Sequence, residues 1–368
     1  MSVTDISLRK KLGLELFRQH KRNAAEIHKL SYLMWECTLR CNLACKHCGS
    51  DCHKDMRQKD MPLTDFLKVI DIVTPHINPH ETMIVITGGE PLMRDDLEIC
   101  GQELYKREYP WGMVTNGLFL TEKKLNSLLN AGLRSITISL DGLEEEHNRM
   151  RGNKNSFQLA FNAISLLTKA KDIIYDIVSC ITADNFTQLN ELKQLLIDTG
   201  VKSWRIFTVF PIGRAENHKK LQLSPLQFKQ LFDFIKETRK EGLINLSYGC
   251  EGFLGGYETD VRDHFYFCHA GINIASVLVD GSISACPNLR SNFTQGNIYQ
   301  DNFWEVWTNR YQPFRNRAWA KKDKCATCKY FRYCEGNGMH LRDENGNLLF
   351  CHLDRIKEGE IIEANDLL

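Results

Sequence analysis

The sequence predicts an α/β fold built as a partial (β/α)6 barrel. Between residue 31 and about residue 210, short and almost continuously apolar runs alternate with longer amphipathic stretches. Strands buried on both faces have such sequences, and regular alternation with helices is typical of parallel βα units. Because the apolar runs number six, the pattern favours an open or partial barrel over a closed eight-stranded one.

Each predicted strand corresponds to one apolar run in the sequence. In chain order the runs are SYLMWEC from residue 31, TMIVITGGE from 82, WGMVTNG from 111, SITISLDG from 135, DIVSCIT from 176 and WRIFTVF from 204. Stretches such as LTEKKLNSLLNAG and SFQLAFNAISLLTKAK fill the gaps and carry apolar residues at helical spacing. Unusual residues follow the first four strands, where the ligand site of such a barrel is expected.

A chain of 368 residues is long for a single core, so we expect one large domain and a smaller appendage. Four segments follow from the pattern. They are an N-terminal helical segment (1–30), the barrel (31–215), a helical bridge (216–249) and a cysteine-rich C-terminal domain (250–368).

Composition and charge narrow the classes of function. The N-terminal segment is charged throughout, so we expect neither a signal peptide nor a membrane span. A cytoplasmic location follows, in which the 14 cysteines would stay reduced and would bind metal or act as reactive thiols. The formal net charge of +1 argues against a nucleic acid partner.

The densest cysteine cluster follows the first strand. Cys41, Cys45 and Cys48 form a CxxxCxxC pattern that can converge on one metal centre without long-range folding. Three cysteines suit an iron–sulfur cluster with one open iron, whereas a structural zinc needs four closed ligands. Cys37 or Cys52 could supply the fourth ligand, so a zinc site stays open at this point.

The order of motifs resembles the radical S-adenosylmethionine (SAM) superfamily. CNLACKHC is followed by TGGEP, TNG and SLDG on successive strands, and the likeness covers most of residues 31 to 215. It implies that Cys41, Cys45 and Cys48 hold a [4Fe-4S] cluster whose open iron takes the amino and carboxylate groups of SAM. One-electron cleavage of SAM to a 5′-deoxyadenosyl radical is then the implied chemistry.

By this resemblance, the turns after strands two to four bind SAM. The residues concerned are Gly88, Gly89, Glu90, Pro91, Asn116, Ser139 and Arg151. The glycines let the backbone approach the ligand, the glutamate accepts a hydrogen bond from the methionine ammonium, and the proline caps the turn. The serine and the arginine hold the methionine carboxylate, and the asparagine faces the ribose or methionine side. The simpler alternatives are ordinary turns at GG and DG, and a surface ion pair for the arginine.

The C-terminal cysteines resemble the SPASM extension of radical SAM enzymes that modify peptides and proteins. The matching residues are Cys268, Gly281, Cys286, Cys325, Cys328, Cys334 and Cys351. The last four would complete one auxiliary [4Fe-4S] cluster. The position expected for the seventh cysteine of the pattern is Gly338.

A second auxiliary site would thus have Cys268, Cys286 and, from YGCEG, Cys250. It is either a three-cysteine cluster with an open iron, a cluster with a non-cysteine ligand, or absent. The simpler alternative for the whole region is a pair of zinc knuckles.

Together the resemblances imply a SAM-dependent radical enzyme that modifies a ribosomally made peptide or small protein by crosslinking, epimerisation or side-chain oxidation. Its electron would come from a donor such as a flavodoxin or ferredoxin. WECTLRCNLACKHCGSDC and GNGMHLR also resemble a branch found with small lipoprotein-type partners. The alternatives are a radical SAM reaction on a small molecule and a non-catalytic iron–sulfur or zinc scaffold.

Overall fold

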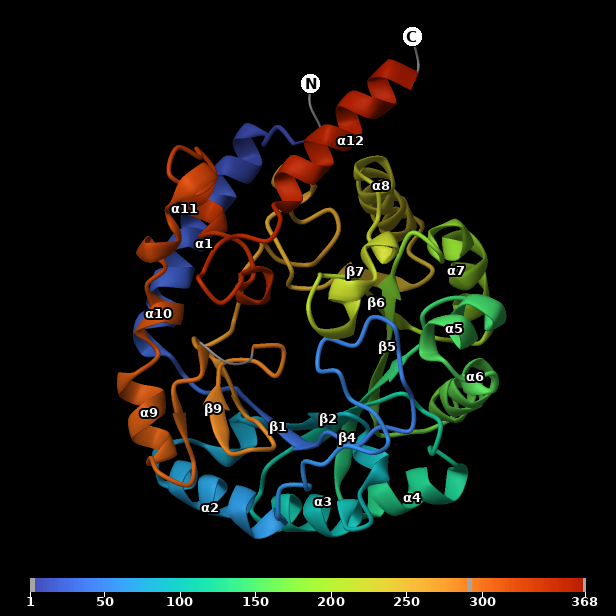
Figure 1. Cartoon of the computed structure of the whole chain (residues 1–368), viewed down its shortest axis with the longest axis vertical. Coiled ribbons are helices and arrows are strands. Elements are labelled where there is room, and N and C mark those ends of the chain that lie inside the picture. Colours follow the sequence, from blue (N-terminus) through green and yellow to red (C-terminus); the bar gives the residue numbers. More distant parts are fainter. Residues whose placement is uncertain (1–3, 290–292, 367–368) are drawn as a thin grey trace.

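The computed structural model describes residues 4–289 and 293–366, and within them a single ten-stranded sheet curves through the molecule (Figure 1). The strand order is β10-β9-β8-β1-β2-β3-β4-β5-β6-β7. The strands are β1 (Tyr32–Thr38), β2 (Met83–Gly88), β3 (Trp111–Thr115), β4 (Leu133–Ser139), β5 (Ile174–Ile181), β6 (Ser203–Thr208), β7 (Asn245–Tyr248), β8 (Ile274–Val277), β9 (Ser282–Ser284) and β10 (Gly296–Asn297).

The first seven strands are all parallel to their neighbours and form the predicted partial barrel. The α/β fold class and the open barrel are therefore confirmed. β7 lies within the segment expected as a helical bridge and pairs with β6. Its four residues are too few to show a period, so no apolar pattern predicts this strand.

Helices cover the outer face of the barrel, as Figure 1 shows for those that follow β1 to β6. The helices of the barrel are α2 (Leu63–Val73), α3 (Leu97–Lys106), α4 (Glu122–Asn130), α5 (Glu144–Arg151), α6 (Ser156–Leu167), α7 (Leu189–Asp198) and α8 (Pro225–Glu241). The others are α1 (Leu8–Ile27), α9 (Phe303–Asn309), α10 (Gln312–Arg315), α11 (Phe331–Cys334) and α12 (His352–Asp366).

Local sequence explains where these helices begin and end. α8 starts with a capping box, in which the Ser224 side chain accepts from the Gln227 backbone and the Gln227 side chain accepts from the Ser224 backbone, and Pro225 occupies its first turn. The same helix stops at Gly242 in the left-handed conformation. α5 stops in the same way at Gly152, which fixes Arg151 as its last helical residue.

The core lies between the sheet and the helices. Trp35, Trp111 and Trp204 come from three different strands, and all three are fully buried. Trp35 stacks on Phe66 of α2 with ring centroids 4.4 Å apart. Each such side chain removes a large apolar area from water, and burial of this kind anchors helices to the sheet.

The C-terminal residues continue the barrel sheet. β8 pairs in parallel with β1, and β9 and β10 follow by antiparallel pairing. The N-terminal helix α1 lies along the C-terminal part, where Lys21 bonds Glu335 at 2.6 Å, and α12 packs beside α8 (Figure 1). The two halves of the chain thus share one sheet, and this sheet fixes the C-terminal cysteines relative to the barrel.

Candidate active site

A cavity of about 340 Å³ opens at the carboxyl ends of the barrel strands. It is lined by the cysteine loop after β1 and by the turns after β2 to β6. Of the residues predicted from sequence, those at the cavity are Cys41, Cys45, Cys48, Gly88, Gly89, Asn116, Ser139 and Arg151. Residues separated by more than a hundred positions in the sequence therefore share one pocket.

The cysteine loop is held by an arginine from the far side of the barrel. Arg214, which follows β6, donates from Nε to the Cys45 carbonyl at 2.8 Å and from Nη1 to the Cys52 carbonyl at 2.9 Å. Its own backbone N–H donates to the Cys48 carbonyl at 3.0 Å. These charge-assisted and backbone bonds hold the cysteine loop against the segment that follows β6.

The three thiols of this loop are not equivalent. Burial raises the pKa of Cys41 to about 12 and also raises the pKa of Cys45 above its usual value. Hydrogen bonding from Cys52, with a further contribution from Arg214, lowers the pKa of Cys48 to about 5. Cys48 is thus the most acidic thiol of the set, and any of the three that is protonated loses its proton when it binds metal.

Within the described ranges, no three His, Cys, Asp or Glu side chains are grouped to hold a single metal ion. The cysteine sulfurs do line a common cavity whose walls include glycine backbone. That donor set and that space fit an iron–sulfur cluster with a small organic ligand beside it.

Gly88 is required where the backbones of β1 and β2 approach each other. Its φ is +141°, and a Cβ there would lie 2.1 Å from the Thr38 carbonyl oxygen. At Gly89 a Cβ would lie 2.4 Å from the Arg40 carbonyl oxygen. The two glycines are thus demanded by the close approach of the chain to itself, and they leave backbone exposed to the cavity.

Glu90 and Pro91 do not line the cavity. The Glu90 carboxylate is buried and accepts hydrogen bonds from Leu92 N–H, the Thr115 hydroxyl and Asn116 N–H at 2.7–3.0 Å. Burial raises its pKa and these bonds oppose the rise, with a net shift upward. In this structure the carboxylate therefore braces the turn after β3, and Pro91 opens the short helix that follows β2.

Arg151 forms the main buried ion pair of the cavity. Its Nε donates to Asp141 Oδ2 at 2.6 Å, and its Nη1 lies 3.7 Å from Cys45 Sγ. Asp141 is 1% exposed and also accepts from the Cys180 backbone N–H at 2.9 Å. Burial raises the pKa of Asp141, but Arg151 and its other partners more than reverse that effect, so the carboxylate stays charged.

Sequence reasoning missed several cavity residues. Asp141 was interpreted only as part of a turn, although its position two residues after Ser139 at a strand end was a usable signal. Arg214 and Asn288 carried no local signal, because they reach the cavity from distant loops. Phe210 follows β6 and completes the wall.

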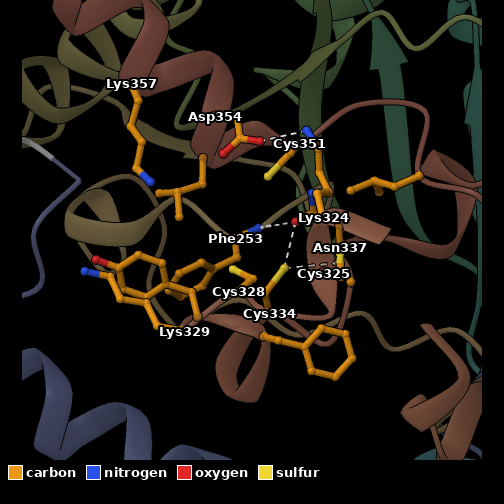
Figure 2. A pocket seen from close by; sticks show the side chains of 15 residues that line it. Phe253, Lys324, Cys325, Cys328, Lys329, Cys334, Asn337, Cys351, Asp354 and Lys357 are labelled. Atoms are coloured by element: carbon orange, nitrogen blue, oxygen red, sulfur yellow. Dashed lines mark hydrogen bonds and ion pairs between the residues drawn. The ribbon is translucent and has the colours of Figure 1, made fainter. Parts of the chain in front are cut away.

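Four C-terminal cysteines surround a second pocket of about 280 Å³ (Figure 2). They are Cys325, Cys328, Cys334 and Cys351, as the sequence pattern grouped them. Cys334 Sγ lies 3.1 Å from Asn337 Oδ1, and Asn337 also accepts from the Phe253 backbone at 3.1 Å. The Lys324–Asp354 ion pair, with nitrogen and oxygen 2.7 Å apart, stands at the rim. Four sulfurs around one cavity fit a fully ligated cluster.

Of the remaining cysteines of the predicted set, Cys250 and Cys268 are tied to the segment around position 338. Gly338 N–H donates to the Glu251 carbonyl at 3.0 Å, which ties it to the residue after Cys250. Burial raises the pKa of the Cys268 thiol, but the Arg317 guanidinium and the Met339 backbone N–H bring it below its usual value. For Cys286, burial raises the pKa to about 12.

A groove of about 310 Å³ adjoins the main cavity and shares Gly49 and Asn288 with it. The groove lies between the loop after β6 and the C-terminal part of the chain. Its walls carry the acidic side chains Glu216, Asp343 and Glu344 and the basic side chain Arg342. No helix among the described residues is both long and apolar enough to cross a bilayer.

Comparison with known proteins supports the sequence resemblances. The family profile of the radical SAM superfamily matches residues 35–196, and that of the SPASM iron–sulfur cluster-binding domain matches residues 268–329. The AdoMet-dependent heme synthase of Oleidesulfovibrio alaskensis is 26% identical, covering 85% of this chain and 85% of the relative. The mycofactocin maturase MftC of Mycolicibacterium smegmatis is 29% identical, covering 83% of this chain and 77% of the relative.

Among solved structures, native anSMEcpe with bound AdoMet and the Kp18Cys peptide superposes with a TM-score of 0.70. The two are 22% identical, and the match covers 92% of this chain and 100% of that one. At this identity the likeness concerns the fold.

Proposed function

Since the chain carries a radical SAM domain followed by a SPASM domain, it is a radical SAM enzyme, and we propose that it modifies a ribosomally made peptide or small protein. The observation that supports catalysis is the convergence of three cysteines, the GG turn and a buried arginine on one cavity. The observation that supports a peptide is the similarity to a peptide maturase along more than four fifths of this chain.

In this proposal Cys41, Cys45 and Cys48 hold the [4Fe-4S] cluster that radical SAM chemistry requires. When bound, SAM and the cluster together supply the one-electron carbon–sulfur cleavage that starts hydrogen abstraction. Gly88 and Gly89 present backbone to SAM, and Ser139 and Arg151 bind its methionine carboxylate. The electron comes from a flavodoxin or ferredoxin.

The protein groups around the cavity act by binding and exclusion. Arg151 already lies within reach of Cys45, so a carboxylate bound there would sit beside the cluster loop. Glu90 accepts a hydrogen bond from the methionine ammonium in this proposal, and its oxygens also hold the turn that presents Asn116. The side chains of Phe210 and Val209 cover the cavity with apolar surface that limits water.

SPASM cysteines hold the auxiliary clusters in the same scheme. Cys325, Cys328, Cys334 and Cys351 form the complete set, and Cys250, Cys268 and Cys286 form the incomplete one. The adjoining groove gives an extended substrate a path from the surface to the cavity. Its acidic walls favour a peptide segment that carries lysine or arginine.

A second candidate function is a radical reaction on a tetrapyrrole. It is favoured by the heme synthase relatives, which are similar over 83–85% of this chain. A tetrapyrrole is a rigid disc with carboxylates, whereas Glu216 and Asp343 outnumber Arg342 on the groove walls, a balance that disfavours an anionic ligand. We therefore place the peptide first.

Two measurements test these proposals in sequence. Anaerobically reconstituted and reduced protein should release 5′-deoxyadenosine from SAM, and the Cys41→Ala variant should not; a scaffold without activity would release none. Candidate peptides are then co-expressed with each form, and their intact masses are compared. A cluster-dependent loss of two hydrogens would support oxidation or crosslinking, and deuterium uptake from heavy water would support epimerisation. Turnover of an iron porphyrin, with no peptide changed, would favour the second candidate.

A further inference from the structure

Gly338 occupies the place of the missing seventh cysteine, and the structure leaves no room for a side chain there. A Cβ at this position would lie 2.5 Å from His340 Cε1, 3.0 Å from His340 Nδ1 and 2.7 Å from the Glu251 carbonyl oxygen. Contacts this short do not occur between real atoms. The imidazole of His340 therefore fills the volume that a cysteine side chain would need.

His340 is a buried side chain with an unused nitrogen. It is 9% exposed, and its Nε2 has no hydrogen-bond partner although the atom is buried. The ring contacts Phe210 with centroids 4.8 Å apart and lines the groove beside the SAM cavity. A buried imidazole nitrogen without a partner is costly, so it indicates a ligand that the protein alone does not provide.

The two residues that precede His340 bond the segments that carry Cys250 and Cys268, and Cys286 lies close enough to both of these cysteines to affect its pKa. Met339, next to His340, provides a backbone N–H bond to Cys268. Gly338 bonds the Glu251 carbonyl, one residue after Cys250. Cys286 precedes Asn288, which lines the same groove as His340. The imidazole thus belongs to the neighbourhood in which a fourth ligand is needed.

The other buried polar side chains near this point bond one another. The Glu251 carboxylate accepts from the Thr208 hydroxyl at 2.6 Å and from the Tyr248 hydroxyl. His352 Nε2 lies 2.9 Å from that same hydroxyl, while His352 Nδ1 has no partner and packs against Gly252. Of the two histidines, only His340 has an unpartnered Nε2 and packs against Gly338.

We propose that His340 is the fourth protein ligand of the auxiliary cluster held by Cys250, Cys268 and Cys286, with Nε2 bound to the iron that lacks a cysteine. The inference rests on the proposed cysteine ligands. Imidazole is a common ligand for iron, and only its lone pair is donated, so no electron or proton leaves the site. Replacing a thiolate by a neutral imidazole makes the cluster one charge less negative, which raises its reduction potential, as histidine does in Rieske centres.

Selective labelling tests this directly in the full-length holoenzyme. The protein is prepared with natural and with ¹⁵N-labelled histidine, and the reduced clusters are studied by pulsed EPR. We expect a strong nitrogen coupling that changes with the label in the wild type and disappears in His340→Ala. His264→Asn is the matched control, because His264 is an exposed histidine of the same half of the chain, and it should keep the coupling.

The wild-type spectrum needs no variant to fold, so the proposal can fail on that spectrum alone. The proposal that histidine is a ligand is overturned if the strong, label-dependent nitrogen coupling is absent. It is also overturned if the protein contains iron for fewer clusters than proposed. Persistence of the coupling in His340→Ala would do the same. In each case, a wild type that cleaves SAM would still support the proposed function. A wild type that does not cleave SAM would refute the proposed function itself. His340→Cys should keep its iron and lose the coupling.

Discussion

The substitution Asp141→Asn probes the ion pair on which the cavity is built. It removes the charge opposite Arg151 and keeps a side chain of the same shape. Both partners are buried, with side-chain exposures of 1% for Asp141 and 10% for Arg151. Breaking a buried pair by removing one charge costs about 3–5 kcal/mol, because the other charge is left uncompensated.

Thermal unfolding of the cluster-free protein measures this cost. In domains of 150–250 residues, a loss of 1 kcal/mol lowers Tm by about 2–4 °C, and larger domains shift less. At about 2 °C per kcal/mol, the loss of 3–5 kcal/mol should lower Tm by roughly 6–10 °C. The matched control is Asp184→Asn, because Asp184 pairs with Arg149 of the same helix at 2.9 Å on the surface. That exposed pair contributes at most about 1 kcal/mol.

SAM adds a second measurement to the same variant. If the methionine carboxylate binds Arg151, it replaces the missing charge, so SAM should raise Tm more in reconstituted Asp141→Asn than in reconstituted wild type. Equal SAM shifts in the two proteins would refute the assignment of Arg151. A fall in Tm no larger than that of the control would refute the argument from the buried pair.

Three further predictions concern other parts of the molecule. Gly88→Ala places a Cβ 2.1 Å from the Thr38 oxygen, so it should abolish SAM binding measured by equilibrium dialysis. Gly200→Ala, which also has a positive φ (+86°) but open space around it, should not. Arg214→Gln should weaken the cysteine loop and lower iron retention after gel filtration, whereas Arg239→Gln, with a surface partner, should leave it unchanged. Burial lowers the pKa of His147 to about 3, so the unfolded state takes up a proton below pH 6.5 and the folded state does not. The free energy of unfolding therefore decreases as the pH falls from 6.5 toward 3, by up to about 1.4 kcal/mol per pH unit for this residue. The urea midpoint of His147→Gln should depend less steeply on pH over that range than the midpoint of the wild type.

The barrel could be predicted from sequence because its signals are local. Each of the six apolar runs overlaps one of the strands β1 to β6, since strands buried on both faces show their burial directly in composition. The CxxxCxxC loop and the GG turn were likewise visible as short motifs. β7 was missed because it is a short strand that depends on pairing with β6.

The rest of the site depends on contacts that no local pattern encodes. Arg214 is 169 positions from Cys45, whose carbonyl it binds, and Arg151 is 106 positions from the Cys45 sulfur. Glu90 was predicted from its place in a motif to accept a hydrogen bond from the methionine ammonium, which stays a prediction, whereas the bonds of its oxygens to backbone and hydroxyl donors became visible only in the structure. The partner of a buried carboxylate is decided by the tertiary fold, so its role could not be predicted from its neighbours in sequence.

The contact between Phe210 and His340 joins the two halves of the proposed mechanism. Phe210 lines the main cavity, and His340 lines the adjoining groove, so a substrate moving from the groove to the cavity would pass both rings. A change at His340 would alter both the ligation of the cluster and the access of substrate to the cavity. A measurement of activity alone could not separate the two effects. Phe210→Leu separates them, because it changes the wall of the cavity and leaves the imidazole in place. If His340 is a ligand, this variant should keep the histidine nitrogen coupling while its KM for the substrate changes.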